Sequence, residues 1–68
     1  MANWKQVYTT SEPYKAEIVK DVLENNGIQP IIVNKKGYLN NLGHCEVLVV
    51  QDKVLFAMKI IDDEIQFK

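Results

Sequence analysis

The signal that most constrains the fold is a helix stop near the middle of the chain, at Asn25-Asn26-Gly27. Glycine at this place readily adopts the left-handed conformation that closes a helix. Downstream, Ile28–Val33 is a short and almost wholly apolar run, which favours a strand. The chain is therefore expected to pass directly from a helix into a strand. The helix is indicated by apolar residues at the spacing of one helical face: Tyr14, Ile18, Val19, Val22 and Leu23.

The flanking segments predict two more strands and a second helix. Trp4–Thr9 mixes aromatic, β-branched and polar residues, as a partly exposed strand does. His44–Val50 alternates between two faces and predicts a further strand. Helical spacing from Val54 to Ile61 predicts the second helix. A short last strand at Ile65–Lys68 is left open.

Both helices are expected to begin at polar caps. Ser11 is interpreted as a cap of the first helix because hydroxyls accept the free amide protons of a helix start, and Pro13 is tolerated in the first turn. Gln51 and Asp52 are assigned the same role before the second helix. Ser11 as a nucleophile is the weaker alternative, since no His lies near it in the sequence.

The resulting order, β-α-β-β-α with a possible short fifth β element, is the α+β ferredoxin-like split β-α-β arrangement. It predicts a single domain over residues 1–68, with two helices on one face of an antiparallel sheet. Pro30 indicates that the second strand lies at a sheet edge or a bulge.

The other face of this sheet is expected to be uncovered. If Val7 and the alternating set Cys45, Val47 and Val49 point at the helices, the uncovered side carries the remaining strand residues. Exposed aromatics on a sheet indicate a covering partner, so we expect self-association as a homo-oligomer. The predicted interaction residues are Trp4, Tyr8 and Leu48, with Gln6, His44 and Glu46 between them.

Charge and composition argue against several partners. All eight basic residues are Lys and the net charge is −1, so the guanidinium fork that reads nucleic acids is absent and no nucleic acid is expected. No run approaches the roughly 20 apolar residues of a membrane span, so no membrane partner is expected. The single Cys45 cannot form an internal disulfide, which fits a reducing cytoplasm.

Metal binding and catalysis are not expected either. His44 and Cys45 are adjacent and therefore point to opposite faces of a strand, whereas zinc takes four ligands and a nucleophilic pair must touch. We expect no cofactor, no metal and no catalytic residue. An enzyme whose site is completed across subunits by His44, Cys45 or Glu46 stays a less favoured alternative.

The best candidate for binding is the connection Asn34–Gly43, which is rich in Asn, Gly and Lys. Ammonium groups, an aromatic ring and amides there can converge on an anionic or polar partner. The competing and simpler interpretation is a polar connection between two strands, because these are ordinary turn residues. The candidate binding residues are Lys35, Lys36, Tyr38, Asn40 and Asn41.

Four segments carry a resemblance to a known family: 7–9, 12–19, 23–28 and 46–50. The family consists of small prokaryotic domains of unknown function, described as "putative signal-transducing protein", and the resemblance covers nearly the whole chain. It implies a ferredoxin-like fold related to the nitrogen-regulatory PII proteins, oligomeric sensors that work through the loop between their second and third strands. No binding residue is assigned from it.

We therefore expect a non-catalytic regulatory or protein-interaction module in signal transduction, whose partner is an unknown protein or small molecule. Self-association would use the uncovered face, and the 34–43 connection would contact the partner. The alternative is an ACT-like regulatory domain that binds a small metabolite.

Overall fold

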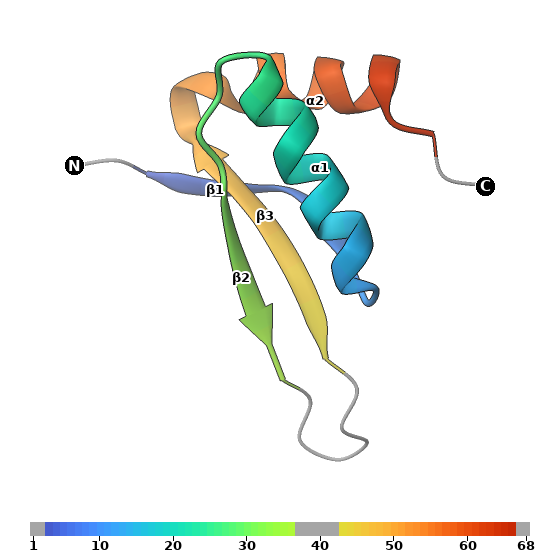
Figure 1. Cartoon of the computed structure of the whole chain (residues 1–68). Helices are drawn as coiled ribbons and strands as arrows, with labels where there is room; N and C mark the ends of the chain where they lie inside the picture. The colour runs from blue at the N-terminus through green and yellow to red at the C-terminus, as the bar shows by residue number, and fades with distance from the viewer. Residues whose placement is uncertain (1–2, 37–42, 67–68) are drawn as a thin grey trace.

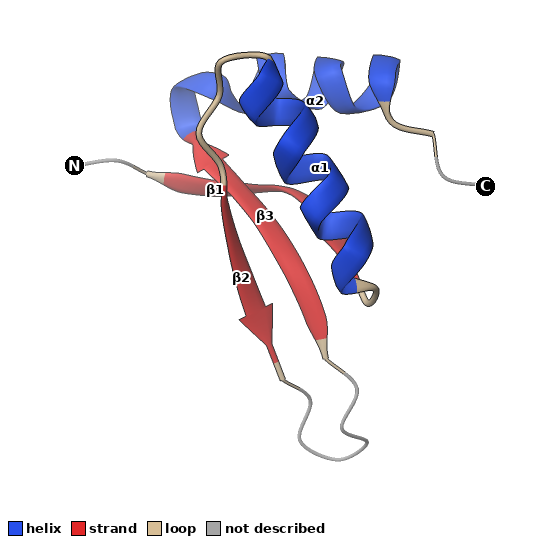
Figure 2. Cartoon of the chain, in the orientation of Figure 1, coloured by secondary structure: helices blue, strands red, loops and turns tan. Residues whose placement is uncertain are grey.

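The computed structural model describes residues 3–36 and 43–66 of the chain. Their order is β-α-β-β-α, as predicted, and the fold is α+β with a ferredoxin-like arrangement (Figures 1 and 2). The elements are β1 (Trp4–Thr10), α1 (Pro13–Asn25), β2 (Ile31–Lys35), β3 (His44–Val50), the 3-10 turn η1 (Gln51–Lys53) and α2 (Val54–Glu64).

The three strands form one antiparallel sheet in the order β1-β3-β2, so β1 and β2 are its edges. The predicted edge position of the second strand is thus confirmed. Residues Cys45, Val47 and Val49 of β3 are buried in one cluster with apolar residues from both helices, as the strand alternation predicted. Both helices therefore cover the same face, and among the described residues no element covers the opposite face. The buried helical residues of this core are Ala16, Val19, Leu23, Ala57 and Ile60.

The helix stop at Gly27 behaves as the sequence predicts. Gly27 has a φ of 84°, its N–H donates to the carbonyl of Glu24, and the N–H of Ile28 donates to the carbonyl of Leu23, both at 3.0 Å. This pair of bonds is the Schellman arrangement, which satisfies carbonyls that a helix end otherwise leaves free. It ends α1 and turns the chain back toward the sheet.

Strand β2 begins later than predicted, at Ile31 rather than Ile28. Two features explain the delay: the amide of Ile28 is used by the helix end, and Pro30 has no N–H to give to a ladder. Ile28 and Pro30 are nevertheless buried. The apolar run is thus divided between a packed connection and a strand.

The predicted caps are wrong. The N-cap of α1 is Glu12 and that of α2 is Lys53, and neither helix has a side-chain cap hydrogen bond. In place of a Ser11 cap, the hydroxyl of Thr10 accepts from the N–H of Glu12 at 3.1 Å. Gln51 instead accepts from the side chain of Asn3 at 3.1 Å, which ties the start of β1 to the end of β3.

After α2, Ile65 has extended backbone and packs against the core, but neither Ile65 nor Gln66 belongs to a strand. The remainder of the possible last strand, residues 67–68, lies outside the described residues. The two helix ends are linked through Asn26, whose amide donates to the carbonyl of Val22 at 2.8 Å and to Glu64 at 3.3 Å.

Candidate functional site

The register of the sheet defines which residues share the uncovered face. Residues directly opposite each other in an antiparallel pair point to the same side. Since Val47 and Val49 face the helices, their neighbours Leu48 and Val50 face away. Following the pairs across both edges gives the uncovered face: Trp4, Gln6, Thr9, Ile31, Val33, Lys35, His44, Glu46, Leu48 and Val50.

The apolar residues of this face lie together, and we call them the apolar patch: Trp4, Ile31, Val33, Leu48 and Val50. Trp4 pairs with Val50, and Leu48 lies between Gln6 on β1 and Ile31 on β2, so the patch crosses all three strands. Trp4 is 42% exposed and Ile31 is 39% exposed. Water therefore contacts a contiguous apolar surface on this side of the sheet.

Tyr8 does not lie where the sequence predicts. The register shifts between Gln6 and Tyr8, so that Val7 is an extra residue and Tyr8 pairs with Val47. A bulge of this kind changes the side to which the following residues point. Tyr8 is consequently half-buried against the core on the helix side, and its predicted place beside Trp4 and Leu48 is wrong.

The opposite end of the uncovered face is polar. His44 Nε2 lies 3.0 Å from Glu46 Oε2, on adjacent positions of the same side of β3. Lys35 pairs with His44 across the strands. The uncovered face thus has an apolar end, at Trp4 and Val50, and a charged end, at Lys35 and Glu46.

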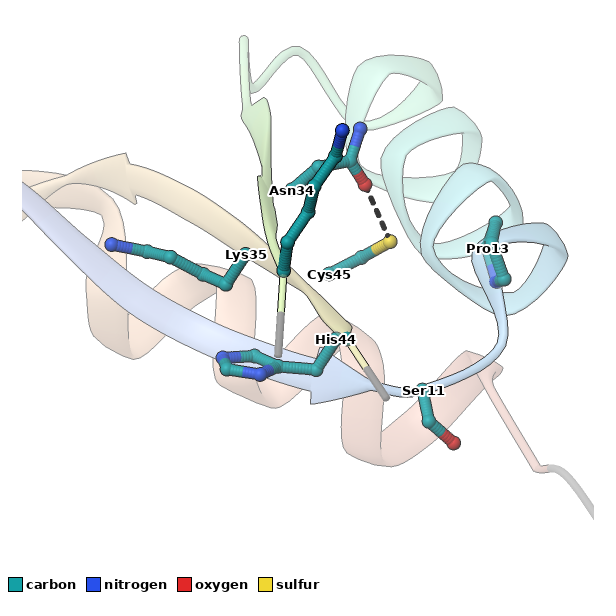
Figure 3. Close-up of a pocket in the computed structure, with 8 residues that line it drawn as sticks. Ser11, Pro13, Asn34, Lys35, His44 and Cys45 are labelled. Atoms are coloured by element: carbon teal, nitrogen blue, oxygen red, sulfur yellow. Dashed lines mark hydrogen bonds between the residues drawn. The ribbon is translucent and has the colours of Figure 1, made fainter. Parts of the chain in front are cut away.

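A pocket of about 300 Å³ lies beside this charged end, and we call it the end pocket. It forms where the turn between β1 and α1 meets the last residues of β2 and the first residues of β3 (Figure 3). These segments meet because β1 and β2 both run antiparallel to β3. The carboxyl ends of β1 and β2 therefore lie at the same end of the sheet, beside the start of β3. Its lining residues are Ser11, Pro13, Asn34, Lys35, Lys36, Gly43, His44 and Cys45.

The thiol of Cys45 forms a hydrogen bond within one wall of the end pocket. Cys45 is 4% exposed, and its Sγ–H donates to Asn34 Oδ1 at 2.9 Å. Figure 3 shows the Asn34 oxygen turned toward the sulfur, with the amide nitrogen on the other side. The interaction therefore fixes the amide so that its remaining group is a hydrogen-bond donor.

The candidate binding residues are only partly brought together. Lys35 and Lys36 line the end pocket, whereas Tyr38, Asn40 and Asn41 lie outside the described residues. The sequence reasoning did not join Ser11, Pro13 and Cys45 to this site. The signal for that junction is topological: the observed order β1-β3-β2 places the turn after β1 beside the end of β2 and the start of β3.

The acidic residue nearest to the first turn is engaged elsewhere. The carboxylate of Glu12 lies 2.7 Å from the ammonium of Lys15, and this hydrogen bond raises the pKa of Lys15 above its ordinary value. A similar hydrogen bond, donated by the Lys20 ammonium to Glu17, raises the pKa of Lys20. Glu12 is not among the residues that line the end pocket.

His44 and Cys45 point to opposite faces, as predicted: the imidazole is 47% exposed, and the thiol is buried. Within residues 3–36 and 43–66, no group of three or more His, Cys, Asp or Glu residues is placed to hold a metal ion. In the same part of the chain, neither helix has the length and apolar character that a bilayer crossing requires.

Comparison with known proteins identifies one family. No curated protein and no solved structure gives a significant match to the chain. A family of unknown function does match, over residues 4–65, which include every helix and strand described above. This chain therefore belongs to the family described as "Putative prokaryotic signal transducing protein".

Proposed function

We propose that this protein is a non-catalytic regulatory module in signal transduction that self-associates through the uncovered face. The family description supports a regulatory role in general. The observation that carries the self-association is the apolar patch, in which Trp4 and Ile31 remain about two-fifths exposed beside Leu48 and Val50. An apolar surface that crosses a whole sheet typically marks an interaction site.

A second copy of the chain is the simplest occupant of this face. It presents the same patch, and a two-fold axis brings like apolar ends together while the charged ends stay at the rim. In this arrangement Trp4 is the anchor, because aromatic residues at the centre of an interface carry most of its binding energy. Lys35 and Lys36, both exposed, remain accessible for a different partner.

The test compares Trp4→Ala with Tyr14→Ala, which removes another exposed aromatic but on α1. We expect sedimentation equilibrium to detect a reversible oligomer of the parent chain. Trp4→Ala should weaken it roughly thirtyfold, the effect of losing about 2 kcal/mol at an anchor residue, and Tyr14→Ala should not. A parent chain that stays monomeric at millimolar concentration, or equal effects of the two variants, would contradict the proposal.

A second candidate function is an ACT-like regulatory domain that binds a small metabolite. The end pocket favours it, because its volume of about 300 Å³ suits a small ligand rather than a protein surface. This function predicts saturable thermal stabilisation by one class of metabolite, increasing with ligand concentration. A thermal-shift screen of nucleotides, amino acids and metal ions in which no compound stabilises the protein would contradict it.

A further inference from the structure

The groups available in the end pocket are hydrogen-bond donors. The Asn34 amide oxygen accepts from the Cys45 thiol, and the amide nitrogen on its other side is a donor. The ammonium groups of Lys35 and Lys36 add further donors, whereas Figure 3 shows the Ser11 hydroxyl turned away from Asn34 and Cys45. A ligand that forms hydrogen bonds with these donors must carry hydrogen-bond acceptors.

The charge of the end pocket also favours a ligand with acceptor groups. Its lining includes Lys35 and Lys36 but no carboxylate, although the chain as a whole carries a net charge of −1. Neither lysine has an ion-pair partner within the described part of the chain. The carboxylate of Glu46 on β3 is paired with His44. The pocket is therefore a locally cationic place on an otherwise slightly acidic molecule.

The two lysines contribute differently. Lys35 belongs to the uncovered face, and Figure 3 shows its side chain extending toward the side of His44, away from Ser11 and Pro13. Lys36 follows the end of β2 and, by strand alternation, returns to the side of Asn34. Lys36 is thus the group for direct contact, and Lys35 adds a charge at the rim.

We infer that the end pocket binds a small molecule bearing a compact oxyanion, a phosphate or a carboxylate, held by Lys36 and the Asn34 amide nitrogen. Lysine acts on such groups as a point charge, and each charge-assisted hydrogen bond is stronger than a neutral one. Pro13 and the buried Cys45 form the less polar wall against which the rest of the ligand packs. This inference rests on the metabolite-binding candidate and does not require self-association.

The test follows backbone amide shifts of the whole chain by NMR during titration with inorganic phosphate and, separately, with acetate at constant ionic strength. We expect saturable shifts confined to the segments that line the pocket. Saturation by phosphate alone identifies a phosphorylated ligand, by acetate alone a carboxylate ligand, and by both a general oxyanion site. Linear shifts, or shifts spread over all surface lysines, with both anions would overturn the inference.

Three variants sharpen the result. Lys36→Gln should weaken binding roughly tenfold, which corresponds to about 1.4 kcal/mol, and Lys53→Gln, the same loss of charge outside the pocket, should leave it unchanged. Asn34→Asp keeps an acceptor for Cys45 but replaces the donor by a negative charge, so it should abolish binding. Equal affinities of the Lys36→Gln and Lys53→Gln variants would overturn the inference even if Asn34→Asp failed to fold.

Sedimentation of the same samples separates this inference from the proposed self-association. Saturable anion binding by a strictly monomeric chain supports the pocket and contradicts only the proposal for the uncovered face. Concentration-dependent association without any saturable anion binding supports the proposal for the uncovered face and contradicts the inference for the end pocket.

Discussion

Replacing Tyr8 tests the β-bulge at Val7, which places Tyr8 on the helix side of the sheet and not on the uncovered face. Because Val7 is an extra residue, Tyr8 pairs with Val47 and packs against the core rather than lying on the uncovered face. Removing a fully buried aromatic side chain costs about 3 to 5 kcal/mol. Tyr8 is half-buried and on an edge strand, so we expect Tyr8→Ala to lower the free energy of unfolding by about 2 kcal/mol.

Urea denaturation followed by circular dichroism measures this change. At this chain length a loss of about 2 kcal/mol corresponds to a melting temperature lower by roughly 10 °C. Thr9→Ala is the matched control, since Thr9 is exposed on the uncovered face and should change the stability by less than about 0.5 kcal/mol. If Tyr8→Ala left stability unchanged and instead abolished self-association, the assignment of Tyr8 to the helix side would be refuted.

Three further substitutions have defined outcomes. Gly27→Ala should cost about 1 kcal/mol in urea denaturation, because the φ of 84° strains an alanine while the space around its Cβ is open. Gly43→Ala should cost more, about 2 kcal/mol by the same assay, because its Cβ would lie 2.5 Å from the carbonyl oxygen of Lys35. Glu12→Gln should return the pKa of Lys15 toward its ordinary value in an NMR titration of the ammonium group. The stabilisation from this pair is present below the ordinary pKa of 10.5 and is lost as the pH rises through the raised pKa of the folded state.

Local patterns in the sequence predict much of the fold. The alternation of β3 correctly assigns Cys45, Val47 and Val49 to the core, because strand periodicity follows from backbone geometry alone. The helix stop is also predicted, because a glycine after two asparagines favours one local conformation. Both signals depend on neighbouring residues and need no knowledge of the tertiary structure.

The errors arise where distant parts of the chain decide the outcome. The bulge at Val7 depends on how β1 pairs with β3, and no periodicity in β1 reveals it, so Tyr8 is assigned to the wrong side. Ser11 has the chemistry of a cap, but Glu12 takes that position. The end pocket escapes prediction for the same reason, since the turn that contributes Ser11 and Pro13 is more than 20 residues from Asn34 in the sequence.

The most direct test of the proposed self-association uses Trp4, the single tryptophan of the chain, as a reporter on the uncovered face. Its fluorescence emission and the sedimentation mass are measured over the same range of protein concentration. We expect the emission to shift to shorter wavelength as Trp4 leaves water, along the same binding curve as the rise in mass. A rise in mass with unchanged Trp4 emission would place the interface elsewhere, and a constant mass would contradict self-association altogether.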